Sequence, residues 1–236
     1  MKLSLEQEHA ANWAINATGP TQVKGSPGTG KSTVALYRVK SLIQKLQETG
    51  QPTQRILYTT YTNALVRSSD QQLKELLGED SACVDVMTAD LLVWNILSSA
   101  ERKLNVARDS TLIGAIERAL QQLQLEGSTH PRVLERLNRD YLLEEICQVI
   151  IARKITTEKD YQNTKRKGRR FGLTDIQREA VWKVYEIFLQ QLNKINQKTW
   201  QQVRLEAEKI LEEKIPFGEK NVSDADHAGW SYDALG

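Results

Sequence analysis

The sequence has few cysteines and no long hydrophobic run, and these absences exclude several classes of protein. Only two cysteines occur in 236 residues, Cys83 and Cys147, and their spacing matches no metal-binding motif. Both lie in apolar stretches, so we expect small buried thiols in a reducing compartment. No segment approaches the roughly 18 apolar residues of a membrane-spanning helix. The polar N-terminal stretch, with Glu6 and Glu8, lacks the apolar region of a signal peptide, and we therefore expect a cytoplasmic protein.

An excess of charge of one sign is also lacking. Lysine and arginine together number 32 and aspartate and glutamate 30, which gives a net charge of +2. A balanced total neither requires nor excludes nucleic acid as a partner, because a basic patch can lie within it. The hydrophobic content of 40% and the charged content of 26% are ordinary for a globular protein. The length is sufficient for one large domain or two small ones.

One stretch carries a specific motif, at residues 25–32. It reads Gly-Ser-Pro-Gly-Thr-Gly-Lys-Ser and fits the G-x-x-x-x-G-K-S pattern of the Walker A phosphate-binding loop. The glycines allow the backbone to curl so that successive N–H groups point at phosphate oxygens. Lys31 would reach the β- and γ-phosphates, and the Ser32 hydroxyl would hold Mg²⁺. The helix expected from Lys31 would direct its positive end at the same phosphates.

A purely structural turn would explain the glycines of this loop but not its Gly-Lys-Ser ending. We therefore predict that the chain binds ATP or GTP together with Mg²⁺. The predicted nucleotide-binding residues are Gly25, Ser26, Pro27, Gly28, Thr29, Gly30, Lys31, Ser32 and Thr33, with Ser32 as the metal ligand.

The sequence around the loop predicts an α/β fold. A short strand is expected at 21–24, and a helix with apolar residues at helical spacing follows the loop. Two further runs, at 55–61 and 83–87, are rich in β-branched, aromatic and apolar residues and predict strands, each followed by a helix. Alternation of strands and helices is typical of a parallel sheet.

From about residue 104 to 215 the pattern changes, and the sequence predicts helices without a strand. The strongest prediction is a helix over 174–194, where Thr174 and Gln177 fit a capping box. This helical region is either inserted into the α/β part or follows it. Its predicted helices cover 112–125, 133–138, 141–153, 174–194 and 199–213.

The N-terminal helix, expected over 5–17, contains a residue with two interpretations. Ser4 and Gln7 fit a capping box, in which Gln7 only stabilises the start of the helix. Alternatively, the Gln7 amide, which both donates and accepts hydrogen bonds, would contact the Watson–Crick edge of adenine. The residues by themselves leave both interpretations open.

Taken in order, these segments resemble the N-terminal part of the UvrD/Rep-type superfamily 1A DNA helicases. Residues 3–10, which include Gln7, resemble the family's Q motif, and residues 25–32 are similar to its motif I. Residues 57–63 resemble motif Ia, with Tyr61 in place of the usual phenylalanine, and residues 84–89 resemble motif Ib. Ala89 and Asp90 replace the aromatic residue and histidine that often follow in motif Ib.

Two later segments extend the resemblance over essentially the whole chain. Residues 173–182 are similar to a helix of the family's 1B subdomain. Trp200 and Val203 resemble the D-[FW]-x-D-[LV] segment, although Thr199 and Gln202 replace both acids.

The resemblance implies a P-loop NTPase (RecA-like) parallel sheet that is incomplete, with a largely α-helical 1B insertion. It divides the chain into an ATP-binding part of subdomain 1A at 1–100, a 1B-like subdomain at 101–222 and a lead-in to the motif II strand at 223–236. It also implies that Gln7 reads adenine and that the intact enzyme translocates along single-stranded DNA from 3′ to 5′.

The resemblance places single-stranded DNA on motifs Ia and Ib. Tyr61 would offer a stacking face, and Thr62, Asn63 and Thr88 would contact phosphates. The alternative is that Tyr61 belongs to the core and that Thr62 and Asn63 only cap a helix.

A basic run at 165–170 is a second candidate for DNA binding. Its charged residues are Lys165, Arg166, Lys167, Arg169 and Arg170. These side chains would neutralise phosphates and give salt-dependent binding. An equally good alternative is a solvated loop.

The family's motif II, a hydrophobic strand followed by D-E-x-Q-D, is missing. Residues 232–235 look like the lead-in to that strand, so we expect an N-terminal portion with no catalytic residue of its own, unable to unwind DNA alone. The acidic stretch 224–227 resembles a DEAH box but follows no buried strand. Two alternatives stay open: a non-catalytic nucleotide- or DNA-binding module, and an unrelated P-loop ATPase whose carboxylate is Asp85.

Overall fold

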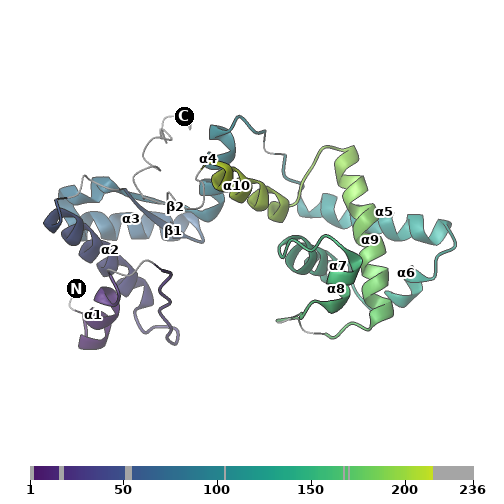
Figure 1. Ribbon diagram of the computed structural model, residues 1–236, viewed down its shortest axis with the longest axis horizontal. Coiled ribbons are helices and arrows are strands. Elements are labelled where there is room, and N and C mark those ends of the chain that lie inside the picture. Colours follow the sequence, from purple (N-terminus) through teal and green to yellow (C-terminus); the bar gives the residue numbers. More distant parts are fainter. Residues whose placement is uncertain are drawn as a thin grey trace. The chain divides into compact units, whose positions relative to one another are not determined.

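The computed structural model describes residues 3–15, 19–50, 55–103, 105–166, 168–169 and 171–214 (Figure 1). They form two compact units that divide within one helix, between Asn95 and Ile96. The first unit is α/β and the second is helical. The predicted domain boundaries at 100 and 222 stay predictions.

The first unit contains a small parallel sheet and the helices that pack on it. Its elements are α1 (Leu5–Asn12), α2 (Lys31–Glu48), β1 (Ile56–Thr60), α3 (Asn63–Leu77), the 3₁₀ helix η1 (Gly78–Cys83), β2 (Val84–Thr88) and the start of α4 (Ala89–Ser99). β1 and β2 pair in parallel, from Ile56 opposite Val84 to Thr60 opposite Thr88. The predicted strands at 55–61 and 83–87 are thus confirmed to within a residue or two.

The core of this unit explains why those two runs form strands. Apolar side chains of α2, α3 and β2 pack together, and inward-facing residues of β1 join them. The buried members are Leu36, Val39, Ile43, Leu73, Cys83 and Val86. Alternate residues of β1 are exposed, as expected for a strand with one face on a core.

Two expectations for this unit are wrong. Residues 21–24 form no strand and are exposed, because β1 and β2 pair with each other and Val23 alone supplies little apolar area to bury. Helix α1 ends at Asn12 instead of residue 17, since Ala14 adopts a left-handed conformation. Its buried residue is Ala11, whereas Leu5 and Trp13 are exposed.

The second unit is a helical bundle with its own core. Its elements are the end of α4, α5 (Asp109–Leu125), α6 (His130–Val133), α7 (Arg139–Glu144), the π-helical segment η2 (Glu145–Ile151), α8 (Glu158–Asn163), α9 (Asp175–Lys194) and α10 (Trp200–Lys214). α5 and α9 contribute most of the buried apolar side chains. Apart from a single bridge between Val106 and Lys198, no strand occurs among the described residues of this unit, which agrees with the sequence.

Helix positions in this unit mostly follow the prediction. α9 begins after Thr174 with the predicted capping box to Gln177. The helix expected over 133–138 is wrong: one short turn occurs earlier, with proline at its start, and ends at Val133. α8 was not predicted from the sequence; Thr157 caps it by accepting a hydrogen bond from the Asp160 backbone.

Candidate nucleotide-binding site

The Walker A loop connects α1 to α2 and curls through left-handed glycines. Gly28 and Gly30 have φ values of 83° and 80°, where a side chain would strain the backbone. At Gly25 an added Cβ would lie 2.6 Å from the Thr29 Oγ1 atom. The Thr29 hydroxyl in turn donates to the Ser26 carbonyl over 2.9 Å. These contacts explain why the loop requires glycine at those positions.

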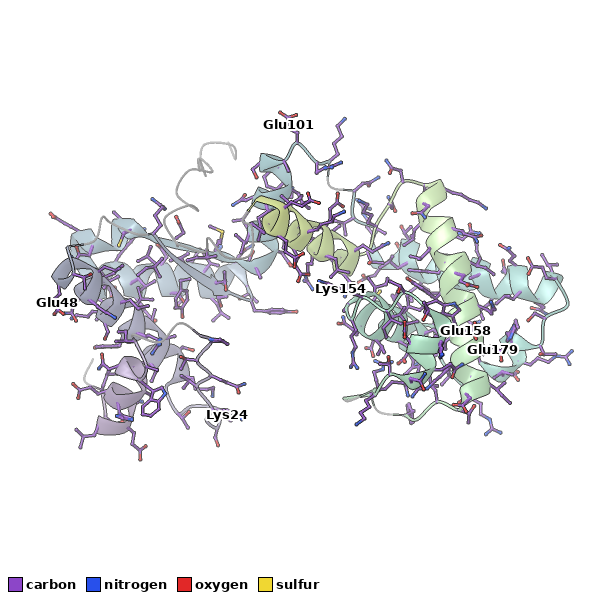
Figure 2. All side chains as sticks on the ribbon, viewed as in Figure 1. Lys24, Glu48, Glu101, Lys154, Glu158 and Glu179 are labelled. Carbon is purple, nitrogen blue, oxygen red and sulfur yellow. The ribbon has the colours of Figure 1, made fainter. Side chains whose placement is uncertain are left out.

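Lys31 lies across this curl. Its Nζ atom donates to the carbonyl oxygens of Gly25 at 2.9 Å and Ser26 at 2.8 Å. The ammonium charge is therefore held at the loop itself. Lys24, in contrast, is exposed on the segment before the loop (Figure 2).

The N-terminus of α2 is open. Gly30 caps it without a side-chain hydrogen bond, and no acidic residue lies in the first turn. The first N–H groups of an α-helix have no partner within the helix, and the helix dipole makes this end positive. Lys31, Ser32 and Thr33 supply those N–H groups, so the arrangement fits a phosphate group.

Gln7 connects α1 to the loop. Its Oε1 accepts from the Ser4 backbone at 3.0 Å and the Ser4 hydroxyl accepts from the Gln7 backbone at 3.2 Å, which confirms the predicted capping box. Its Nε2 also donates to the Thr29 carbonyl at 3.2 Å. A Cβ on Gly30 would lie 2.5 Å from that nitrogen. The predicted contact with adenine stays a prediction.

A contact that the sequence analysis missed holds α1 against α2. The Arg38 guanidinium, on α2, donates to the carbonyls of Ala11 at 3.3 Å and Trp13 at 2.7 Å. Carbonyls at the end of a helix lack partners within it, and a cation at that end is favourable. No sequence pattern marks Arg38, because its partners are backbone atoms of another helix.

The four residues predicted to contact DNA through motifs Ia and Ib lie at the carboxyl ends of β1 and β2. Because Thr60 and Thr88 are paired, Tyr61, Thr62 and Asn63 lie at the same sheet edge as Thr88. Tyr61 is 91% exposed, so it does not belong to the core. The Thr62 hydroxyl accepts a hydrogen bond from the first turn of α3, which confirms the predicted capping for Thr62, whereas Asn63 is the first residue of that helix. The Thr88 hydroxyl likewise accepts a hydrogen bond from the first turn of α4.

Asp85 lies in the other half of β2. It pairs with Arg55 through two hydrogen bonds, one of which is 2.8 Å between Nε and Oδ2. Ligands of parallel α/β sheets bind at the carboxyl ends of the strands, whereas Asp85 is near the amino end. This position argues against Asp85 as the catalytic carboxylate of an unrelated ATPase.

The basic run does not form an open phosphate-binding surface at Arg166 and Arg169. Their side chains are only 5% and 11% exposed, and both pair with Glu145, which is fully buried. Arg166 Nε lies 2.5 Å from Glu145 Oε1, and Arg169 Nε lies 2.9 Å from Oε2. The interpretation of a solvated loop is equally wrong for these two arginines, since both alternatives required exposed guanidinium groups.

Glu145 is held as a carboxylate by this network. Burial raises the pKa of Glu145, but hydrogen bonds from Arg166 and Tyr161 and the charges of Arg166 and Arg169 outweigh it, so that the pKa is lowered overall. The Tyr161 hydroxyl donates to Oε1 at 2.8 Å, and burial together with the Glu145 charge raises the pKa of that hydroxyl.

Both cysteines are free and buried, as predicted. Burial raises the pKa of Cys83, and burial together with the charge of Asp109 raises the pKa of Cys147 to about 12. Neither thiol is therefore a nucleophile at neutral pH.

Several predicted features lie outside the described residues. They are Lys167, Arg170, the acidic stretch 224–227 and the lead-in at 232–235. Within the described ranges, no cluster of three or more histidine, cysteine or acidic side chains could hold a metal ion. No helix in the same ranges is long and apolar enough to cross a membrane.

Comparison with known protein families gives a match over most of the chain. A family model described as UvrD/REP helicase N-terminal domain matches residues 3–228. No curated protein matches the chain.

Proposed function

The chain belongs to the UvrD/REP helicase N-terminal domain family, as its motifs indicated, and from this premise we propose that it is the ATP-binding N-terminal portion of an ATP-dependent 3′–5′ DNA helicase. This is a family of ATP-dependent helicases. The observation that carries the proposal for this chain is the open N-terminus of α2 beside Lys31.

The loop residues have the chemistry that ATP with Mg²⁺ requires. Lys31 would exchange the carbonyls of Gly25 and Ser26 for the β- and γ-phosphates. The backbone N–H groups of the first turn of α2 would bind phosphate oxygens, and the Ser32 hydroxyl would hold Mg²⁺. Gln7 would turn its Nε2 from the Thr29 carbonyl to the adenine edge, which would couple base recognition to the loop.

Single-stranded DNA would cross the carboxyl edge of β1 and β2. The exposed Tyr61 ring offers a stacking face at the same sheet edge as Thr62 and Thr88. The hydrogen bonds that the two threonine hydroxyls accept hold these side chains at the starts of α3 and α4. Lys165 is exposed in the second unit and stays a proposed phosphate contact. Arg166 and Arg169 are not proposed as DNA contacts, because they bind Glu145.

Replacing Tyr61 by alanine is expected to weaken binding of a labelled oligothymidylate by about 1–3 kcal/mol, because stacking of one base on an aromatic ring contributes that much. Fluorescence anisotropy at fixed salt measures the change. Tyr61→Phe is the matched control: it keeps the ring and should bind within about twofold of the wild type. Equal losses in both variants would contradict a stacking role.

The sequence contains no Asp-Glu pair, the core of the family's motif II, and the described Asp85 is engaged by Arg55. We therefore expect ATP turnover by this chain, with or without single-stranded DNA, to equal that of Lys31→Ala in a phosphate-release assay. This observation also favours a second candidate, a non-catalytic nucleotide- or DNA-binding module. DNA-stimulated turnover that Lys31→Ala abolishes would contradict the expected inactivity of the chain.

A further inference from the structure

Helix α1 carries Gln7 but has little apolar packing to hold it in place. Ala11 is its buried side chain, at 1% exposed, whereas Leu5 is 85% exposed. A helix of eight residues is not stable by itself in water, because so few hydrogen bonds do not offset the cost of nucleation. The position of α1 therefore depends on its polar contacts with the rest of the first unit.

Polar contacts attach α1 near both of its ends. Near its start, the Gln7 Nε2 atom donates to the Thr29 carbonyl of the loop at 3.2 Å. At its end, the Arg38 guanidinium donates to the carbonyls of Ala11 at 3.3 Å and Trp13 at 2.7 Å. A cation is favourable at the carboxyl end of a helix, and hydrogen bonds from a charged donor are stronger than those from a neutral one.

Arg38 belongs to the same helix as the groups that would bind phosphate. α2 begins at Lys31, and Arg38 lies about two turns, or roughly 10 Å, further along it. Because α2 is one continuous helix, a contact at Arg38 fixes the end of α1 relative to the start of α2. The guanidinium thus ties the helix that carries Gln7 to the helix that would hold the nucleotide's phosphates.

The placement of Gln7 leaves little tolerance for movement of α1. Its Nε2 atom lies so close to the loop that a Cβ on Gly30 would be 2.5 Å away from it. Hydrogen bonds from N–H to oxygen or nitrogen acceptors have a narrow range of length, about 2.7–3.2 Å. A shift of α1 by about 1 Å would therefore take the amide out of reach of an acceptor at the loop.

We propose that Arg38 is a positioning residue for base recognition, which holds α1 on α2 so that Gln7 can select ATP over GTP. Arg38 acts through Gln7 and does not bind the nucleotide itself, so this role rests on the proposed ATP site. Binding of phosphate fits Arg38 less well, because its guanidinium is engaged by two carbonyls of another helix, about two turns beyond Lys31.

The ratio of the affinities for ATP and GTP tests this role. It is measured on the full chain with ribose-labelled fluorescent ATP and GTP and Mg²⁺. Arg38→Met removes the guanidinium and should lower the preference for ATP about fivefold, the usual contribution of one hydrogen bond. Binding of magnesium tripolyphosphate, which has no base, should stay within about twofold of the wild type by calorimetry. Arg67→Met is the matched control, since it removes an exposed guanidinium from α3 and should keep the preference.

A double variant separates positioning from a general structural role. In a Gln7→Ala background, Arg38→Met should lower the preference for ATP no further, because no amide is left to position. Losses that multiply would mean that Arg38 acts independently of Gln7 and would overturn the proposal. Arg38→Lys keeps the charge on a shorter side chain and should retain part of the preference. It preserves the test if thermal melting shows that Arg38→Met does not fold.

Hydrogen exchange tests the contact without any nucleotide. The backbone amides of α1 should exchange faster in Arg38→Met than in the wild type, while those of α2 keep their protection. Unchanged exchange in α1 would overturn the positioning role.

The outcomes also distinguish this proposal from the proposed function. If neither ATP nor tripolyphosphate binds to the wild type, the ATP site itself fails, and the role of Arg38 in base selection fails with it. If ATP binds through Lys31 but without preference over GTP, or if Arg38→Met keeps the preference, the role of Arg38 alone is overturned.

Discussion

Replacing Glu145 by alanine is expected to lower the free energy of unfolding of the helical unit by about 3–5 kcal/mol, the usual effect of removing one partner from a buried ion pair. Glu145 is 0% exposed and binds Arg166, Arg169 and the Tyr161 hydroxyl. Without the carboxylate, Arg166 would stay buried with a charge that its remaining contacts, the Tyr141 hydroxyl and the Phe171 carbonyl, do not neutralise. The loss should appear in urea unfolding followed by the fluorescence of the buried Trp182, which stacks on Tyr161.

Glu144→Ala is the matched control for this prediction. Glu144 precedes Glu145 and pairs with Arg169 at 2.6 Å, but its side chain is 63% exposed. An exposed ion pair contributes about 0–1 kcal/mol, so this variant should unfold close to the wild type. Similar losses in the two variants would show that burial does not determine how much the Glu145 contacts contribute to the free energy of unfolding.

The same carboxylate predicts a dependence of stability on pH. Burial raises the pKa of Glu145, yet the hydrogen bonds and charges of its partners lower it below its ordinary value of 4.5. The folded state therefore binds a proton less readily than the unfolded state, and its extra stability is present above that value and lost as the pH falls through the folded pKa. Glu145→Ala should lack this loss of stability at low pH. If the free energy of unfolding depended on pH in the same way in the variant and the wild type, the role of Glu145 would be contradicted.

Features that depend on neighbouring residues in the chain were predictable from the sequence. The capping boxes of Ser4 with Gln7 and of Thr174 with Gln177 need only a spacing of three residues, and the structure contains both. The strand at Ile56–Thr60 was predictable because this stretch is a local run of β-branched, apolar and aromatic residues.

Features that depend on distant partners were not predictable in the same way. The expected strand at 21–24 has no neighbouring strand to pair with among the described residues, and its own sequence does not reveal that. Arg166 and Arg169 look like exposed charges in a basic run, but Glu145, about twenty residues earlier, draws both inward. The available signal was Glu145 itself, a charge beside the mostly apolar stretch Ile146–Ile151 that would need a partner once buried.

The nucleotide site was predictable only in part. Its motif specifies the curl of the loop and the start of α2, because glycine conformations and the helix N-terminus are local properties. The contact between Gln7 and the Thr29 carbonyl joins residues that are 22 positions apart, so the motif could not predict it.

Lys31→Ala is expected to weaken binding of a fluorescent ATP analogue with Mg²⁺ by about 100-fold, because a charge-assisted contact to phosphate contributes roughly 1.5–3 kcal/mol. Removal of the side chain also removes the hydrogen bonds to the carbonyls of Gly25 and Ser26. The melting temperatures of the variant and the wild type must therefore be compared, to distinguish a disrupted loop structure from the loss of the lysine charge. Lys24→Ala is the matched control, since it deletes an exposed lysine from the segment just before the loop and should bind as the wild type does (Figure 2).

The pattern of losses would identify what the loop binds. Loss in Lys31→Ala with retention in Lys24→Ala assigns the affinity to the charge held at the curl of the loop, as the proposed function requires. Gln7→Ala then separates base from phosphate recognition: it should lower the preference for ATP over GTP while Lys31 still binds the phosphates. Equal affinity of Lys31→Ala and the wild type would mean that the Lys31 ammonium does not contact the nucleotide's phosphates, and the proposal of an ATP site at this loop would be contradicted.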